Sequence, residues 1–218
     1  MKTINKFIYS GVLCLLNIIL IFCLKHFDIR QIGPWDTSIG FSHINRAVFK
    51  LAGGFNRTWY NITSYIGILA LGIAFLFACM GLYQLITRKD LIKVDPEILS
   101  LGFIYVLLAI IYIMFERFPI NYRPVIIPGT AGPEPSYPST HTILTCTIVI
   151  SGLMIMKNYI KSDMLRKILN VIGSALIVIM IFGRLASGVH WFTDIVGAVL
   201  QSAMLLFLYS GIIDVLKD

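Results

Sequence analysis

The chain has 218 residues, of which 57% are hydrophobic and only 13% are charged, and its mean hydropathy is +0.83. Soluble globular domains carry about 25% charged residues, so this composition excludes an ordinary soluble protein and predicts a polytopic membrane protein. The net charge is +7, but the basic residues are spread among loops and form no stripe that would suit a nucleic-acid partner. The length fits one membrane-embedded domain, residues 1–218, rather than two.

Six apolar segments approach the length of about 20 residues that a helix needs to cross a bilayer. They lie at residues 7–24, within 58–87 from about residue 62, and at 98–115, 140–156, 168–183 and 191–213. Asp95-Pro96-Glu97 is typical of a helix start, with an N-cap, a first-turn proline and a first-turn acid. We therefore expect an all-α bundle of six transmembrane helices.

Six spans place both termini on one side of the membrane. On that side the short loops 88–93 and 157–167 are rich in Lys and Arg, and the positive-inside rule assigns such loops to the cytoplasm. Segments 25–61, 116–139 and 184–190 then face outward. The sequence predicts a multi-pass protein of the plasma or inner membrane with cytoplasmic termini.

The first span and the segment after it have alternative interpretations. Residues 7–24 follow a basic N-terminus like that of a signal peptide, but the long apolar run lacks a small-residue cleavage pattern, which favours an anchor. In the outer segment 25–61 apolar side chains recur at helical spacing, at Phe41, Ile44, Val48, Leu51 and Phe55. We interpret this segment as an amphipathic helix at the membrane interface. Packing of that helix on the bundle is favoured over a lid.

The fourth span begins with Pro138-Ser139-Thr140-His141. Ser139 is expected to be the N-cap of this helix, and a helix N-terminus with free backbone N–H groups binds anions. His141 would lie in the first turn at the membrane surface, where it can act as a general acid. Capping plus an incidental histidine is the alternative, which explains the serine better than the histidine. In the loop before it, Arg123 and Arg117 are candidate cations for a bound anion.

The last two spans meet at Gly183–Asp194, where Arg184 ends the fifth span and a short loop with Gly188 returns the chain. His190 and Asp194 have i, i+4 spacing, so on a helix they would share a face. The carboxylate would then fix the imidazole tautomer and leave the other nitrogen free as a nucleophile. Taken alone, the pair is more often structural and the arginine more often a headgroup contact.

Together these residues suit phosphoryl transfer at the outer face. They supply a nucleophile, an orienting carboxylate, an acid and cations for phosphate oxygens. No Cys/His spacing typical of a metal site occurs, and the outer carboxylates Glu116 and Glu134 are isolated. We expect neither a metal nor a cofactor.

The motifs resemble those of the type 2 phosphatidic acid phosphatase superfamily of membrane lipid phosphatases, whose signatures are K-x6-RP, PSGH and SR-x5-H-x3-D. The third signature is complete here except that Gly183 replaces the leading serine. In the second, Thr140 replaces the glycine. The first is partial, because Arg123-Pro124 match but Glu116 occupies the lysine position.

The resemblance implies a six-helix bundle in which His190 is the phosphohistidine nucleophile, Asp194 its orienting group and His141 the leaving-group acid. It also implies phosphate binding by Arg123, Ser139 and Arg184, with Thr140 close to the phosphate. Arg117 is adjacent to Glu116, the residue that departs from the first signature, but on a helix one residue corresponds to about 100° of rotation. Arg117 could replace the lysine only if the backbone there is not helical.

The leading hypothesis is metal-independent hydrolysis of a lipid phosphate or pyrophosphate at the outer leaflet. Candidate substrates are undecaprenyl pyrophosphate, phosphatidylglycerophosphate, phosphatidic acid and lipid A phosphates, so the expected partners are the bilayer and a phospholipid or polyprenyl phosphate. One alternative is a phosphotransferase that passes the phosphoryl group to an acceptor lipid or alcohol. Another is a non-catalytic lipid-binding or transport protein, which Glu116 favours and the two histidines disfavour.

Overall fold

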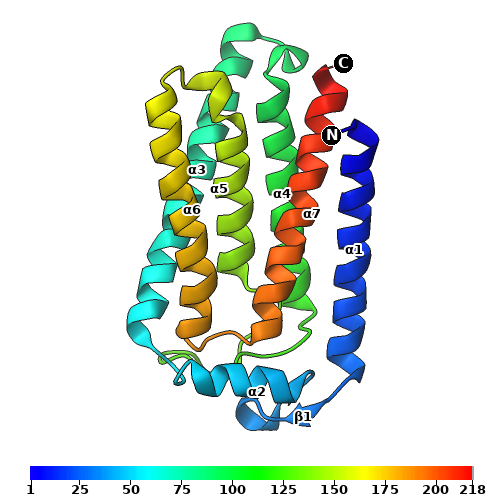
Figure 1. Cartoon of the computed structure of the whole chain (residues 1–218), viewed down its shortest axis with the longest axis vertical. Coiled ribbons are helices and arrows are strands. Elements are labelled where there is room, and N and C mark those ends of the chain that lie inside the picture. Colours follow the sequence, from blue (N-terminus) through cyan, green and yellow to red (C-terminus); the bar gives the residue numbers. More distant parts are fainter. Residues whose placement is uncertain (218) are drawn as a thin grey trace.

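The computed structural model describes residues 1–217, which form an upright helical bundle with a smaller helix across one end (Figure 1). Over these residues the α-helices are α1 (Thr3–His26), α2 (Ser42–Leu51), α3 (Arg57–Arg88), α4 (Pro96–Arg117), α5 (Thr140–Tyr159), α6 (Asp163–Ala186) and α7 (Phe192–Lys217). The remaining elements are the 3-10 helices η1 (Pro34–Asp36) and η2 (Leu91–Lys93) and the strands β1 (Arg30–Gln31) and β2 (Ser38–Ile39), which pair antiparallel.

The prediction of an all-α chain with six candidate membrane spans is confirmed. Within residues 1–217, α1, α3, α4, α5, α6 and α7 are long and apolar enough to cross a membrane. Two helices, α3 and α6, begin before the predicted apolar runs with a capped polar first turn. Ser162, for example, accepts a hydrogen bond from the Leu165 N–H and starts α6 five residues before the predicted span. Asp95 does precede α4, but its carboxylate binds Gln84, Arg88 and Tyr159 instead of capping the helix.

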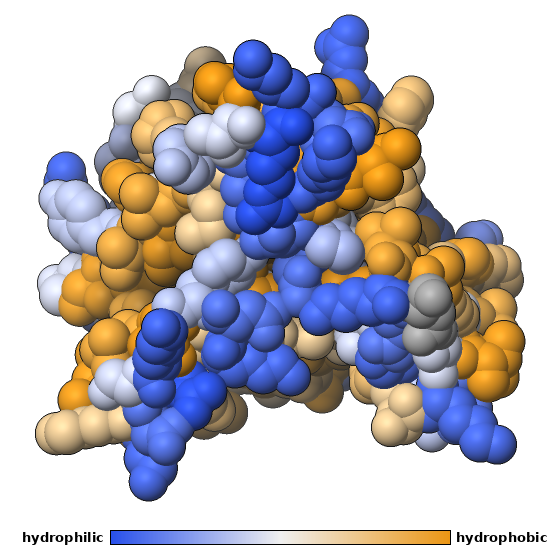
Figure 2. All heavy atoms as spheres, turned by 90° about the horizontal axis from the view of Figure 1, so that it is seen from above, coloured by the Kyte–Doolittle hydropathy of each residue, from blue (hydrophilic) through white to orange (hydrophobic). Residues whose placement is uncertain are grey.

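Helix α5 lies at the centre of the bundle and packs against α3, α4, α6 and α7, whereas α1 packs against α7 on the outside (Figure 1). The largest apolar core lies between α4, α5 and α7, around Ile104, Ile143 and Leu205. Large apolar side chains remain exposed on α1, α3 and α4, as expected for surfaces that contact lipid. Viewed from the end that carries both termini, the molecule is hydrophilic over much of that face with apolar side chains around its edge (Figure 2).

Helix α2 lies across the other end of the bundle, against the start of α7 (Figure 1). Its contact face is more polar than the sequence suggested. Ser42 and Asn45 are buried, and Asn45 accepts a hydrogen bond from the Thr193 N–H at 3.2 Å and donates to Thr193 Oγ1 at 3.1 Å. In the predicted apolar stripe, Ile44 and Leu51 are exposed. Pairing of Asn45 with the free N–H groups at the start of α7 therefore orients α2.

The start of α2 is stabilised from outside the helix. The Asp28 carboxylate accepts hydrogen bonds from the His43 N–H at 2.8 Å and from Ser42 Oγ at 2.9 Å. The bond from the His43 N–H lowers the pKa of Asp28, although burial acts in the opposite direction. At neutral pH Asp28 is thus ionised and serves as a remote N-terminal cap for α2.

We predict that Asn45→Ala destabilises the protein. The substitution leaves the buried N–H and hydroxyl of Thr193 without their partner, at a cost of about 1–3 kcal/mol. For a chain of this size the apparent melting temperature in detergent should fall by roughly 2–12 °C. Asn61→Ala is the matched control, because Asn61 is exposed on α3 and its loss should change little. Equal melting temperatures for the two variants would contradict the assignment of Asn45 as a docking contact.

Candidate active site

Four of the residues singled out from the sequence meet where α6 ends and α5 and α7 begin, at the end of the bundle opposite the termini (Figure 1). His141 begins α5, Arg184 lies in the last turn of α6, and His190 and Asp194 flank the start of α7. The structure brings these four side chains into one connected group of polar contacts.

Arg184 lies at the centre of this group and is fully buried. Its Nη2 atom lies 3.3 Å from His141 Nδ1 and 3.4 Å from His190 Nε2. Its Nη1 atom donates to Thr63 Oγ1 on α3 at 3.2 Å, and the guanidinium carbon lies 5.5 Å from the Tyr60 ring centroid. Arg184 is therefore not an exposed headgroup contact, since its side chain points into the bundle and touches both histidines.

Four polar groups surround the Asp194 carboxylate, and three of them donate hydrogen bonds to it. Oδ2 lies 2.5 Å from Ser136 Oγ, 2.8 Å from the Trp191 N–H nitrogen and 3.5 Å from His190 Nδ1, while Oδ1 accepts from Asn121 Nδ2 at 2.9 Å. The prediction that His190 and Asp194 share a helix face is wrong, because α7 begins at Phe192. By accepting the Trp191 N–H, Asp194 caps the helix from its first turn and leaves His190 in the preceding loop.

The loop between α6 and α7 turns at Gly188, as predicted, with φ +66°. A side chain is excluded there for a second reason, since a Cβ at this position would approach the Gly54 carbonyl oxygen to 2.2 Å. The linker between α2 and α3 is thus held against this loop, where the Asn56 N–H also donates to the Ser187 carbonyl at 3.0 Å. This close contact fixes where His190 enters the site.

Ser139 occupies the N-cap position of α5, but its hydroxyl does not cap the helix. Ser139 Oγ instead pairs with Thr142 Oγ1 at 2.9 Å, and its N–H donates to the Asp194 carbonyl at 3.2 Å. The predicted cap is therefore wrong, because the nearby Thr142 hydroxyl is the closer partner. The Ser139 backbone ties the start of α5 to the start of α7. Thr140 is half-buried and makes no side-chain hydrogen bond within the described chain.

The two loop arginines have different positions. Arg123 is mostly buried, with Nε 3.3 Å from Glu134 Oε2 and 3.4 Å from the Pro135 carbonyl oxygen. In residues 1–217 its Nη1 and the Nε of Arg184 are buried without a hydrogen-bond partner. Arg117 is exposed in the last turn of α4, so the structure does not bring it to the group, and the backbone there is helical. Glu116 is exposed next to it.

The two arginines affect the ionisation of His190. Burial, followed by the positive charges of Arg184 and Arg123, lowers the pKa of His190 well below its usual value. The imidazole is therefore neutral at physiological pH. With Nε2 directed at a guanidinium N–H and Nδ1 at the Ser136–Asp194 pair, the ring carries its proton on Nδ1. Nε2 then has a free electron pair.

Several residues of this group were not found from the sequence. Ser136 and Asn121 lie in the irregular loop before α5 and contact the Asp194 carboxylate. Thr63 and Gly67 lie on one face of α3, and a Cβ at Gly67 would come within 2.7 Å of the His141 ring. A signal for α3 was present, since Tyr60, Thr63 and Gly67 recur at helical spacing in an otherwise apolar span.

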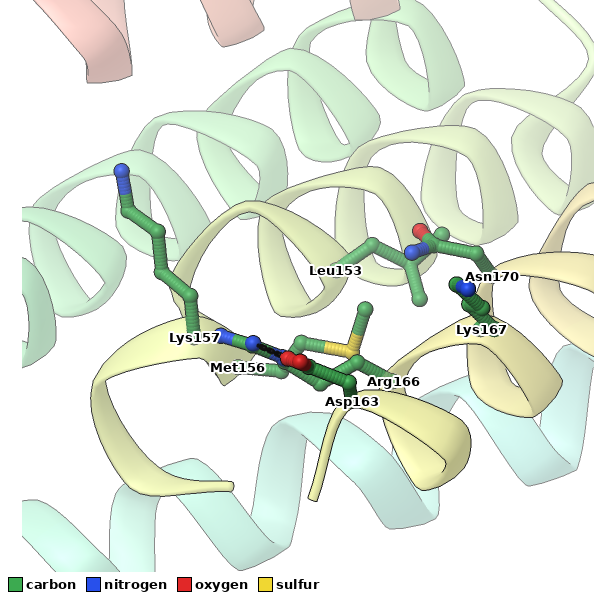
Figure 3. Close-up of a pocket in the computed structure, with 7 residues that line it drawn as sticks. All are labelled: Leu153, Met156, Lys157, Asp163, Arg166, Lys167 and Asn170. Atoms are coloured by element: carbon green, nitrogen blue, oxygen red, sulfur yellow. Dashed lines mark hydrogen bonds and ion pairs between the residues drawn. The ribbon is translucent and has the colours of Figure 1, made fainter. Parts of the chain in front are cut away.

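Two other features of the chain bear on where a ligand could bind. Within residues 1–217, no group of three or more His, Cys, Asp and Glu side chains is placed to hold a metal ion. A hollow of about 380 Å³ lies between the ends of α5 and α6 away from the histidines (Figure 3). There Arg166 is paired with Asp163, and Lys157 extends away from the other basic side chains. The basic groups of this hollow do not converge as those around His190 do.

A polytopic helical bundle with a buried His–His–Asp–Arg group at one end defines the class of this protein, and the comparisons show what it is similar to. Residues 117–217 match the family model of the PAP2 superfamily. The chain is also similar to a structure described as the first transmembrane PAP2 type phosphatidylglycerolphosphate phosphatase from Bacillus subtilis. The TM-score is 0.61, with 20% identity over 93% of this chain and 94% of that chain.

The predicted resemblance to the type 2 phosphatidic acid phosphatase superfamily is therefore confirmed, with residues 117–217 as the PAP2 segment. At this identity the likeness to the Bacillus subtilis structure shows the fold alone. A search among curated proteins found no match. The match to the PAP2 superfamily suggests a phosphatase.

We predict that His190 stays neutral far into the acid range. In protein labelled with ¹⁵N-histidine, its ring signals should not move between pH 8 and pH 5.5, because the pKa of His190 is well below its usual 6.5. Arg184→Gln removes a positive charge beside the ring and should raise this pKa. A titration midpoint near 6.5 in the unchanged protein, or a lower one in the variant, would contradict the geometry of the group.

Proposed function

We propose that this protein is a phosphatase that hydrolyses a lipid phosphate or pyrophosphate through a phosphohistidine intermediate on His190. One observation carries the proposal: a single guanidinium nitrogen of Arg184 contacts His141 Nδ1 and His190 Nε2. A phosphoryl group bound by Arg184 would therefore lie between a nucleophile and a proton donor. Arginine binds tetrahedral oxyanions through parallel N–H groups.

Buried arginine N–H groups support phosphate as the ligand. Arg184 Nε and Arg123 Nη1 are buried and without partners in the described chain, and unpaired buried donors are costly. Phosphate oxygens would accept from both side chains and neutralise two adjacent positive charges. Ser139 and Thr140, at the start of α5, lie at a helix N-terminus that favours the same anion. Arg117, which is exposed, has no role in this proposal.

In the first half-reaction the Nε2 electron pair of His190 forms a bond to phosphorus. The bond between phosphorus and the leaving oxygen breaks, and its electrons depart with that oxygen, which takes a proton from His141. Through His190 Nδ1, the anionic Asp194 stabilises the positive charge that develops on the ring. Arg184 and Arg123 balance charge on the phosphoryl oxygens.

The second half-reaction returns the enzyme to its starting state. His141 removes a proton from water, whose oxygen bonds to phosphorus while the nitrogen–phosphorus bond breaks and its electrons return to Nε2. Inorganic phosphate leaves, and His141 is protonated again. Every proton and charge is handled by side chains of this chain, so the proposed reaction requires no metal ion.

The bundle suggests how a lipid reaches this site. The hydrophilic end with the termini (Figure 2) and the basic loops beside it support a cytoplasmic location for that end, so the His190 end would face outward. The apolar stripe of α2 is rotated by roughly a quarter turn about the helix axis from the side that faces the bundle. This orientation suits a helix that lies in the plane of the membrane interface. Residues 1–218 would act as one membrane domain of the plasma or inner membrane.

The substrate is proposed to be an amphiphile with a phosphate at headgroup depth. Phosphatidylglycerophosphate is the candidate that the name of the similar structure suggests. Phosphatidic acid, undecaprenyl pyrophosphate and lipid A phosphates present the same group to Arg184.

We expect the purified protein to release phosphate from one or more of these lipids with EDTA present. His190→Ala removes the nucleophile, so release should fall by at least about 10³-fold, while the variant keeps its elution volume and melting temperature. Release by His190→Ala at the wild-type rate would refute the mechanism. Product formation that requires an added acceptor alcohol would instead identify a phosphotransferase, and binding without turnover a non-catalytic lipid protein.

The contact between α3 and His141 gives a second prediction. Gly67→Ala places a methyl group where the His141 ring now lies, so the ring must move away from Arg184. A displacement of about 1 Å lowers turnover by roughly 100-fold. Gly72→Ala is the control on the same helix, because a Cβ there meets nothing within 4 Å. If both variants turn over at the same rate, α3 does not position His141.

A further inference from the structure

The contact between His190 and Asp194 is longer than a hydrogen bond between such groups. His190 Nδ1 and Asp194 Oδ2 are 3.5 Å apart, whereas charge-assisted N–H···O bonds measure about 2.7–2.9 Å. A third group contacts both of them. Ser136 Oγ is 3.2 Å from His190 Nδ1 and 2.5 Å from the same carboxylate oxygen.

We propose that Ser136 is a positioning residue that links the nucleophile to its carboxylate. In this arrangement the Nδ1–H of His190 donates to Ser136 Oγ, and the Ser136 hydroxyl donates to Asp194 Oδ2. The inference rests on the proposed function, which it deepens. The serine acts through His190 and does not itself contact the substrate phosphate.

The directions of the neighbouring hydrogen bonds support this order of donors. The Asp194 carboxylate is ionised in this role and can only accept, so the hydroxyl must donate to it and offer its lone pairs to Nδ1. On the opposite side of the ring, Arg184 can only donate, and its Nη2 faces Nε2. Both neighbours therefore select the tautomer with the proton on Nδ1, and Nε2 keeps the electron pair that attacks phosphorus.

The loop is built to hold Ser136 in this place. Its side chain is buried, its N–H donates to the Asn121 carbonyl at 3.1 Å, and Tyr122 and Pro135 form an isolated bridge beside it. The Asn121 side chain binds the other oxygen of Asp194 at 2.9 Å. Two neighbouring loop residues thus hold the two oxygens of one carboxylate, which fixes the direction in which Oδ2 faces Ser136.

Steady-state kinetics of three variants on the best lipid substrate test this inference. Ser136→Ala should lower kcat by about 10–100-fold, as with other groups that orient a histidine through its second nitrogen, and should change KM less than twofold. Ser136→Thr keeps the hydroxyl and should recover most of the rate. Ser202→Ala is the control, because Ser202 is a buried serine of α7 that binds backbone carbonyls.

A kcat for Ser136→Ala within twofold of wild type would overturn the proposal. So would a loss that Ser136→Thr fails to reduce, or one that appears in KM alone. If wild type itself releases no phosphate, the proposed function fails first, and the kinetic variants do not bear on Ser136.

The tautomer of His190 provides a readout that does not depend on turnover. The chain has four histidines, so ¹⁵N ring signals can be assigned from His26→Gln, His43→Gln and His141→Gln proteins. Wild type should show His190 with a protonated Nδ1 and an unprotonated Nε2. Ser136→Ala should shift the Nδ1 signal and populate the other tautomer. A proton on Nε2 in wild type, or identical signals in Ser136→Ala, would refute the link.

Discussion

The arrangement of this end of the bundle depends on one buried cation that has no carboxylate partner among residues 1–217. Arg184 is fully buried, and its neighbours are a threonine, a tyrosine ring and two histidines. Removing a guanidinium from water costs several kcal/mol when no anion pairs with it. Instead of neutralising the charge, the surrounding elements place polar atoms around it, so three helices and a loop must converge at this point.

That convergence explains which parts of the site could be read from the sequence. The six spans follow from apolar length alone, and Arg184, His190 and Asp194 were identifiable because ionisable side chains beside apolar helices are rare and usually functional. Their predicted location on the same side of the membrane indicated that they belong to one site. The motif spacing also fixed the turn at Gly188, whose positive φ the structure shows.

The remaining features depend on contacts between distant segments, which no local pattern records. Ser136 and Thr63 are small polar residues like many others in the chain, and their roles exist only because the α4–α5 loop and α3 approach α7 and α6. Ser139 and Asp95 illustrate the opposite error. Both stand at helix starts and both have the right side chain for a cap, yet the Ser139 hydroxyl pairs with Thr142 in the first turn of α5, and the Asp95 carboxylate pairs with the distant Tyr159. The polar docking face of α2 was hidden for the same reason, since Asn45 is buried only because α7 offers it unpaired N–H groups.

The outermost helix, α1, reaches the same region from outside the PAP2 segment. The Tyr137 hydroxyl, just before the start of α5, donates to Asn17 Oδ1 of α1 at 3.3 Å, and Asn17 is buried within an otherwise apolar span. Thr63 and Gly67 likewise come from α3. Residues 117–217 hold the recognisable chemistry but not all the contacts that shape it. The part of the chain that shapes the site is therefore larger than the part that the family model matches, and an excised PAP2 segment would lack the α3 side chains Tyr60 and Thr63 that contact its own arginine.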